Sequence, residues 1–304
     1  MTAAAGSAER QPPPGEVVTL VEDRLHLLAN PYELGGGVST HPPGSSGRST
    51  MNCYLVTCAD RHVLIDAGLT IHAQAIIAQL QALLAPGRPL DILPLRFGEF
   101  NAVCNVGALA DRLGVERVYG TLLGRPQDWL DFQGTPSASR RDALARAQAM
   151  PLPPVGTIVL GRDRPLRTLL GPLRLLPLPW AFDEATGMLY TADVFTWLPS
   201  TGAAGAVLDD VAGDRTTEDD VYRSLVDNRY WWLQGARTDG IRAELDALYA
   251  DYDIAILAPG YGGVVTDRAA IARQFALLDQ ALARAGAADP PSLTETSTGI
   301  GRGA

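Results

Sequence analysis

Four side chains that could take part in acid–base chemistry each follow a predicted strand: Asp66, Glu99, Asp193 and Tyr261. Loops at strand ends gather along one edge of a sandwich, so we expect these four residues to share one edge. Glu99 and Asp193 in a partly dry cleft would suit a general acid–base pair or a pair of substrate anchors. Alternatively, backbone amides, Arg96 and water satisfy them as inert carboxylates, and Tyr261 either donates a hydrogen bond to a ligand or fills space.

Histidine is confined to the start of the chain. The four histidines are His26, His41, His62 and His72, and none follows position 72. His41 lies in a glycine-rich loop from which it could swing into the cleft, but we favour a solvated surface position for it. Nucleophiles later in the chain therefore have no histidine nearby in sequence to activate them.

The three cysteines are Cys53, Cys58 and Cys104. An odd number without an export signal indicates reduced thiols in a cytoplasmic protein. Cys53 and Cys58 would lie on opposite faces of one strand, so they cannot chelate one metal ion together. Cys104 could be a nucleophile, but without a neighbouring histidine we favour an inert buried thiol.

The basic residues exclude several functions. All 25 are arginine, and the absence of lysine rules out Schiff-base chemistry and a P-loop lysine. The net charge of −9 argues against a nucleic-acid partner, since nucleic-acid-binding domains are usually basic. The chain has no run of about 18 apolar residues or more, so we predict no membrane span.

The remaining pattern predicts one domain over 16–285, flanked by disordered tails at 1–15 and 286–304. Strands are predicted within 17–28 and at 51–57, 62–65, 92–95, 115–119, 158–160, 166–170, 173–177, 188–192 and 254–257. Helices are predicted at 73–84, 106–113, 140–149, 240–249 and 268–285. Strand runs followed by helices, twice over, indicate an α/β fold of two packed sheets with helices outside.

Four segments in this order resemble the metallo-β-lactamase superfamily. They are Asn52–Val56 with Leu64–Gly68, then Phe97–Asn105, Asp183–Asp193 and Ala258–Gly262. The second is similar to the metal motif of the flavodiiron and oxygen-binding diiron branch, whose glutamate matches Glu99. The resemblance covers roughly residues 16–285 and implies a four-layer αββα sandwich.

The departures from that family concern its metal ligands. The family's histidines fall on Phe97, Ala102 and Tyr261, and its aspartate falls on Asn101. The histidine expected after residues 175–177 is missing, and the segment offers Trp180 instead. Iron and zinc sites depend on imidazoles and carboxylates. These departures from the resemblance therefore imply a degenerate site with no metal and no cofactor. Of the family's acidic residues at the site, only Asp66, Glu99 and Asp193 remain.

The predicted pocket has further candidate residues around the old metal position. Phe97, Phe100, Trp180 and Trp197 would turn it into an apolar cavity for a hydrophobic or aromatic ligand, or would plug it. Asn101 and Cys104 would line it as well. Two carboxylates in a dry cleft repel, so we expect Arg96 to be their cationic partner.

Three hypotheses for function remain open. The first is a metal-free protein that binds a small molecule, or catalyses a metal-independent reaction, with Glu99, Asp193 and Tyr261. The second is a metallohydrolase or diiron protein with unorthodox ligands. The third is a non-catalytic subunit that forms a homodimer or pairs with an active homologue, for which the aromatic run 230–232 could supply a lid or an interface.

Overall fold

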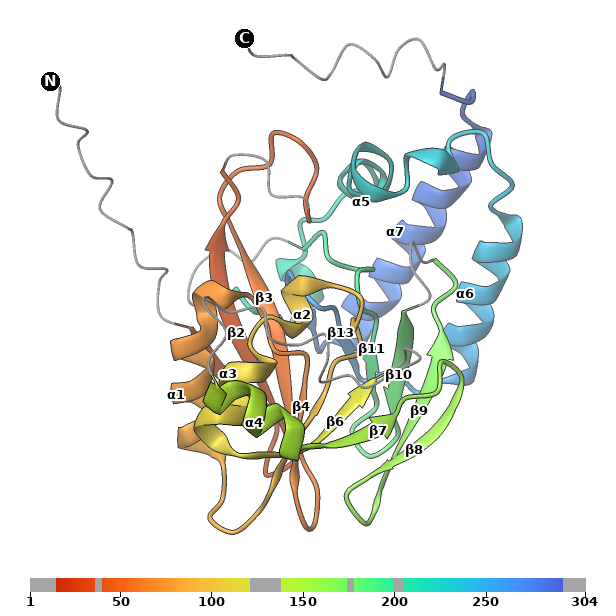
Figure 1. Ribbon diagram of the computed structural model, residues 1–304. Helices are drawn as coiled ribbons and strands as arrows, with labels where there is room; N and C mark the ends of the chain where they lie inside the picture. Colours follow the sequence, from red (N-terminus) through yellow and green to blue (C-terminus); the bar gives the residue numbers. More distant parts are fainter. Residues whose placement is uncertain (1–14, 36–39, 121–137, 174–177, 199–204, 292–304) are drawn as a thin grey trace, which may run out of the picture.

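The computed structural model describes residues 15–35, 40–120, 138–173, 178–198 and 205–291. They form two sheets of seven strands, packed face to face and covered by helices on both outer faces (Figure 1). This is the four-layer αββα sandwich that the sequence predicts. In this part of the chain no helix has the length and apolarity needed to cross a bilayer.

The first sheet runs in chain order from β1 to β7. Its strands are β1 (Glu16–Val21), β2 (Leu25–Glu33), β3 (Arg48–Thr57), β4 (His62–Ile65), β5 (Leu90–Leu93), β6 (Val115–Gly120) and β7 (Gln148–Pro151). The strands from β4 to β7 pair in parallel, so their carboxyl ends lie at one edge.

The second sheet has the order β12-β14-β13-β11-β10-β9-β8. Its strands are β8 (Gly156–Leu160), β9 (Arg164–Leu170), β10 (Pro179–Asp183), β11 (Met188–Tyr190), β12 (Val207–Leu208), β13 (Ile256–Ala258) and β14 (Val264–Val265). β11 and β13 pair in parallel, which places the loops that follow them side by side.

The helices divide between the two outer faces. α1 (Ala73–Leu83), α3 (Val106–Leu113) and α4 (Ala138–Arg146) pack on the first sheet, and α2 (Phe100–Val103) is a short turn before α3. α5 (Glu218–Ser224), α6 (Asp239–Asp251) and α7 (Arg268–Ala287) cover the second sheet.

Side-chain alternation along each strand separates the layers. On β3, Cys53 and Leu55 face the helices of the first sheet, whereas Tyr54 and Val56 enter the core between the sheets. Successive residues of a strand point to opposite faces, so one strand serves two cores. Each buried leucine-sized side chain stabilises the fold by about 1.5–3 kcal/mol.

Several segments differ from the predicted elements, since β12, α5 and β14 form where no strand or helix was predicted. The helix predicted over 140–149 ends at Arg146, and β7 follows it as an edge strand beside β6. Pro151 can end such a strand because an edge strand need not use every backbone donor. Of the strand predicted at 173–177, residues 174–177 lie outside the described residues, and the strand next to β9 is β10.

Candidate functional site

Loops after four strands meet at one edge of the sandwich. Asp66 follows β4, Glu99 follows β5, Asp193 follows β11 and Tyr261 follows β13. The two sheets are joined there by an isolated bridge between Met51 and Tyr261. The structure therefore brings together the four residues that the motif order places on one edge.

Two polar side chains from β3 hold the loop that carries Tyr261. Asn52 donates from Nδ2 to the carbonyls of Pro259 and Gly262, at 3.1 and 2.9 Å. The hydroxyl of Tyr54 donates to the Pro259 carbonyl at 2.6 Å. Buried carbonyls need such donors, which explains why this strand carries polar residues within an apolar run.

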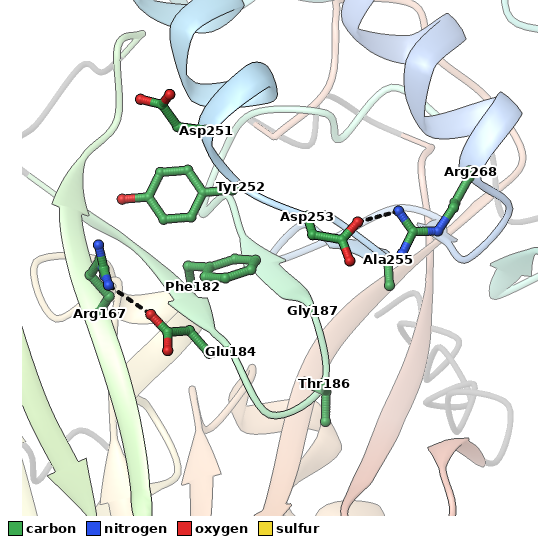
Figure 2. Close-up of a pocket in the computed structure, with 10 residues that line it drawn as sticks. All are labelled: Arg167, Phe182, Glu184, Thr186, Gly187, Asp251, Tyr252, Asp253, Ala255 and Arg268. Atoms are coloured by element: carbon green, nitrogen blue, oxygen red, sulfur yellow. Dashed lines mark hydrogen bonds and ion pairs between the residues drawn. The ribbon is translucent and has the colours of Figure 1, made fainter.

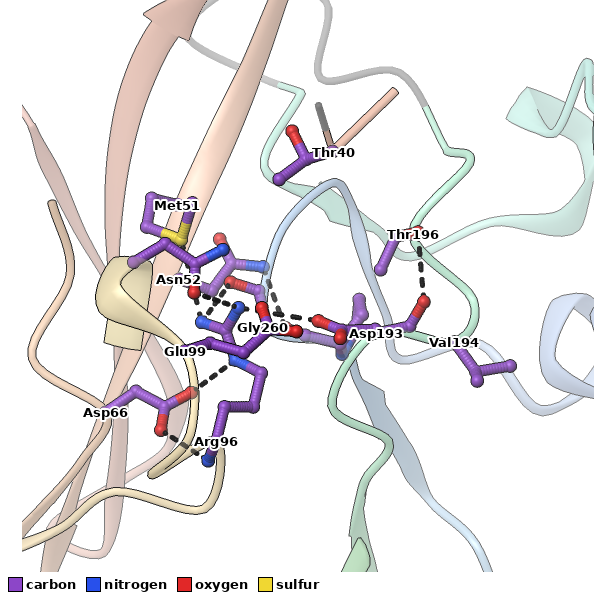
Figure 3. Close-up of polar contacts among 12 residues, drawn as sticks. Thr40, Met51, Asn52, Asp66, Arg96, Glu99, Asp193, Val194, Thr196 and Gly260 are labelled. Atoms are coloured by element: carbon purple, nitrogen blue, oxygen red, sulfur yellow. Dashed lines mark hydrogen bonds and ion pairs between the residues drawn. The ribbon is translucent and has the colours of Figure 1, made fainter. Parts of the chain in front are cut away.

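Arg96 lies at the centre of the site and is fully buried (Figure 3). Its Nε donates to Oδ2 of Asp66 at 2.8 Å, and its Nη1 donates to Oδ1 of Asn101 at 3.1 Å. The same Nη1 lies 3.5 Å from Oδ1 of Asp193. Burial opposes the charged form, but Asp66, Asp193 and Glu99 raise the pKa of Arg96, so it remains a cation.

Arg229 is the second cation of the site. Its Nη1 lies 2.5 Å from Oδ2 of Asp193 and 3.2 Å from Oε1 of Glu99. It ends a single π-helical turn, Leu225–Arg229, and such turns often occur at functional sites. No sequence motif identifies Arg229, because it follows an acidic stretch at 209–220 in which no strand or helix is predicted. We call Asp66, Arg96, Glu99, Asp193 and Arg229 the arginine–carboxylate cluster.

The two outer carboxyl groups of this cluster titrate differently. Burial raises the pKa of Asp193 to about 6, although Arg96 and Arg229 act against it. Burial also acts to raise the pKa of Glu99, but the contacts with Asp193 and Arg229 outweigh it and lower that pKa. Asp193 is thus the carboxyl group of this pair that is protonated first as the pH falls.

Tyr261 forms the aromatic wall of the cluster. Its ring centroid lies 5.8 Å from Cζ of Arg96 and 5.9 Å from Cζ of Arg229, within cation–π range. The ring of His41 lies 5.7 Å from it. Burial raises the pKa of Tyr261, so its hydroxyl stays protonated at neutral pH.

His41 therefore belongs to the site, which differs from the solvated position favoured by the sequence analysis. It is half-buried, and its Nδ1 lies 2.9 Å from Oγ1 of Thr40. Burial and the charge of Arg229 lower its pKa to about 4. A neutral imidazole at physiological pH adds no further positive charge beside the two arginines.

Strained backbone surrounds the cluster. Asp66, Ala192 and Phe195 have positive φ angles of 58°, 52° and 64°, and Asp23 is the one other non-glycine residue of this kind in the described segments. Each costs on the order of 1 kcal/mol or more and persists when packing imposes it. Asn105 contributes to this, since its Nδ2 donates to the carbonyls of Ala67 and Leu69, both at 2.8 Å.

The predicted apolar cavity does not form, because its aromatic residues lie in different cores. Phe97 packs with the helices of the first sheet, and Trp180 packs with those of the second. Trp180 is in β10, where alternation turns it toward Phe195, 6.2 Å away between ring centroids. Phe100 is exposed, and Cys104 is only partly exposed at the end of α2.

A groove of about 760 Å³ opens beside the cluster. His41, Leu198 and Gly263 line it on the side next to Tyr261, and Trp197 and Leu34 add apolar surface. Further lining residues come from the segments 42–48 and 205–224. We call this cavity the groove.

A second hollow of about 490 Å³ lies at the other edge of the second sheet, where β11 and β13 begin (Figure 2). Its aromatic part is Phe182 and Tyr252, with ring centroids 4.8 Å apart. Two ion pairs on its rim, Arg167 with Glu184 and Arg268 with Asp253, are exposed. None of the predicted site residues lines it.

The donors at the site do not fit a di-metal centre. Within the described residues no group of three or more His, Cys, Asp or Glu side chains is arranged to hold a metal ion. Phe97 and Ala102 are packed in the core of the first sheet and have no donor atom. The carboxylates that remain are bound to Arg96 and Arg229, whose charges would repel a metal cation.

No protein-family model and no curated protein sequence matches this chain. Solved structures of flavodiiron cores are similar in fold. The Flv1 flavodiiron core of Synechocystis sp. has 17% identity and a TM-score of 0.62, over 89% of this chain and 61% of that one. A mutant of the flavo di-iron protein of Thermotoga maritima has 16% identity and a TM-score of 0.61, over 89% and 62%.

A third similar structure is the rubredoxin oxygen:oxidoreductase of Desulfovibrio gigas, with 12% identity and a TM-score of 0.60, over 88% and 60%. This chain spans about three fifths of the length of these three proteins. The resemblance to the flavodiiron branch of the metallo-β-lactamase fold is thus confirmed at the level of fold.

Proposed function

We propose that this chain is a metal-independent binding protein that holds a small molecule in the groove beside the arginine–carboxylate cluster. The observation that supports this best is Arg229, whose guanidinium bridges Glu99 and Asp193. Arg96 pairs with Asp66 in the same way. Each carboxylate of the cluster is already committed to a fixed cation, so the cluster forms a rigid polar unit behind the groove.

Binding fits this arrangement better than hydrolysis does. Metal-assisted hydrolysis needs a cation that lowers the pKa of bound water to about 7. The guanidinium groups supply charge but have no vacant site for water. The side chains of Asp193 and Glu99 are only 6% and 13% exposed, and both contact Arg229. A substrate would have to displace Arg229 to reach either of them.

A ligand screen by thermal shift tests this proposal. The matched pair of variants is Ser46→Trp, which fills the groove from an exposed position, and Ala250→Trp, which adds the same side chain to exposed α6. Compounds that raise the melting temperature of the wild type should do so in Ala250→Trp and lose that effect in Ser46→Trp. Compounds that stabilise both variants equally would place binding elsewhere and refute the proposal.

Metal analysis provides a separate check. Protein purified without chelator should contain much less than one zinc or iron per chain, because the donors at the site are neutralised. Stoichiometric metal would favour a metalloprotein with unorthodox ligands instead.

Exposed aromatic residues favour a second candidate, a subunit that pairs with another chain. Trp231 and Trp232 are 50% and 41% exposed, and Phe100 next to Glu99 is 67% exposed. Tryptophan on a surface is typical of protein interfaces. Sedimentation of the wild type and a Trp231→Ser/Trp232→Ser variant tests this, since a dimer held by these residues should dissociate in the variant.

A further inference from the structure

We infer that the groove binds a small organic cation, an amine or guanidine with an apolar body. This inference rests on the proposed function and adds the chemical class of the ligand. It follows from the charges that line the groove, from its apolar wall and from one buried hydroxyl group.

The groove has more carboxylates than free cations. Four carboxylates and three arginines line it: Asp209, Asp210, Asp214, Asp220, Arg48, Arg215 and Arg223. Arg48 pairs with Glu33 at 2.8 Å, and Arg223 pairs with Asp227 at 3.4 Å. Neither Glu33 nor Asp227 lines the groove. The positive charges of Arg48 and Arg223 are therefore balanced by carboxylates outside the groove.

The negative charges of the four groove carboxylates are balanced less completely by neighbouring cations. Asp214 pairs with Arg273 at 3.1 Å. Asp210 and Asp220 accept hydrogen bonds only from nearby helix starts, which leaves their negative charge in place. Asp209 has no ion pair in the part of the chain that the structure describes. Three carboxylates therefore face the groove against one arginine, Arg215.

The arginine–carboxylate cluster behind the groove adds to this imbalance. It holds three carboxylates and two guanidinium groups, so its formal charge is −1 when all five groups are ionised. His41 is half-buried and lines the groove, and its ring lies 5.7 Å from that of Tyr261, which contacts both arginines of the cluster. As a neutral ring it does not compensate the negative charge. A cation is the ligand that both regions attract.

The apolar side of the groove suits the body of such a ligand. Leu34 and Leu198 are buried in its wall, and Trp197 presents a partly buried indole. The indole nitrogen is already bonded to Oε1 of Gln274 at 2.7 Å, which fixes the ring. A fixed aromatic face attracts an ammonium or guanidinium group as well as an apolar chain.

One buried hydroxyl group in the groove lacks a partner. Thr216 lines the groove and is 4% exposed, yet its Oγ1 has no hydrogen-bond partner among the described residues. The other polar atoms around it are occupied, since its amide donates to Asp214 and its carbonyl accepts from Arg273. Buried hydroxyl groups are usually satisfied, so this one in the groove wall keeps an unused hydrogen-bonding capacity and can accept an N–H donor.

Isothermal titration of the full chain with three matched probes tests the inference: 2-phenylethylammonium, 2-phenylethanol and 3-phenylpropanoate. The cation should bind at least about tenfold more tightly than the alcohol or the anion, and its affinity should fall as salt is added. Asp209→Asn should weaken the cation about three- to tenfold. Asp246→Asn removes the same charge from the exposed face of α6 and should leave the affinity unchanged.

Each outcome separates the inference from the proposed function. The alcohol or the anion could instead bind more tightly than the cation and lose that binding in Ser46→Trp. This result would overturn the cationic class of the ligand, but the proposal that the groove binds a small molecule would stand. An equal effect of Asp209→Asn and Asp246→Asn would also overturn it, since the cation would then bind elsewhere. If none of the three probes binds, and Ser46→Trp weakens the binding of no screened compound, both the inference and the proposed function fail.

Discussion

Arg229 Nη1 lies 2.5 Å from Oδ2 of Asp193, although 36 residues separate them in the chain. The same nitrogen reaches Glu99, 130 residues away. One side chain thus joins the loop after β5, the loop after β11 and the segment between α5 and α6. We therefore expect the stability of the site edge to depend on this side chain.

Replacing Arg229 with methionine should lower the free energy of unfolding by about 3 kcal/mol, because two nearly buried carboxylates would lose their shared cation. Urea denaturation at pH 7 measures this. The matched control is Arg223→Met, because the ion pair of Arg223 with Asp227 is about half exposed. This substitution should change the free energy of unfolding by less than about 0.5 kcal/mol. Equal losses in both variants would show that the bridge does not stabilise the edge.

The difference between Arg96 and Arg229 shows what the sequence could predict about the site. Arg96 is adjacent to the motif at 97–105, so proximity in the chain identified it as a partner of the carboxylates. Arg229 comes close only through tertiary packing of a π-helical turn, which no local pattern indicates. The carboxylates themselves were predictable because each one follows a strand.

Asp193 should make the protein more stable as the pH falls from 7 toward 4. Its pKa of about 6 in the folded state exceeds the value of 3.8 expected for an unfolded chain, so the folded state binds the proton more tightly. The advantage of the wild type over Asp193→Asn should therefore grow by about 1–3 kcal/mol between pH 7 and pH 4. Denaturant titrations of both proteins at several pH values measure this, and a constant difference would contradict the raised pKa.

His41 should make the protein less stable as the pH falls, which is the opposite of the effect of Asp193. Its folded-state pKa of about 4 lies below the ordinary value of 6.5, so its stabilising effect is lost as the pH falls through that interval. The ring resonances of His41, assigned by comparison with His41→Gln, should titrate near 4 by NMR. Arg229→Met should raise this pKa because one of its two causes is removed. A midpoint near 6.5 in the wild type would mean that His41 is solvated, as the sequence analysis favoured.

Aromatic residues were harder to place from the sequence than the acidic ones. Trp180 lies in a strand whose neighbours alternate between two cores, so a shift of one residue in the predicted strand reverses its direction. The nearest predicted strand ends at residue 177, before Trp180, whereas β10 spans Pro179–Asp183, so no predicted strand gave the direction of Trp180. The layer order was predictable because it depends on many strands and tolerates such errors.

Hydrolysis of β-lactams, acyl thioesters and lactones should not rise above the background rate. The cluster commits its carboxylates to two guanidinium groups and leaves no donor set for a water-activating metal ion, so we expect no catalyst for the step that limits these reactions. Assays with and without added Zn²⁺ or Fe²⁺, and with a chelator, measure this. Hydrolysis that a chelator removes would contradict the expectation that the arginines exclude a metal.

Gly260→Ala should destabilise the protein by about 2 kcal/mol, since a Cβ at this position would lie 2.5 Å from Cζ and Nε of Arg96. Arg96 cannot move aside because its guanidinium is bound to Asp66 and Asn101. Gly240→Ala is the matched control: that glycine lies in the first turn of α6 with nothing near its added Cβ, and alanine there should be neutral or slightly stabilising. If the clash with Arg96 is the cause, Gly260→Ala should cost much less in an Arg96→Met background. The same cost in both backgrounds would show that the glycine serves the backbone of its own loop instead of making room for the arginine.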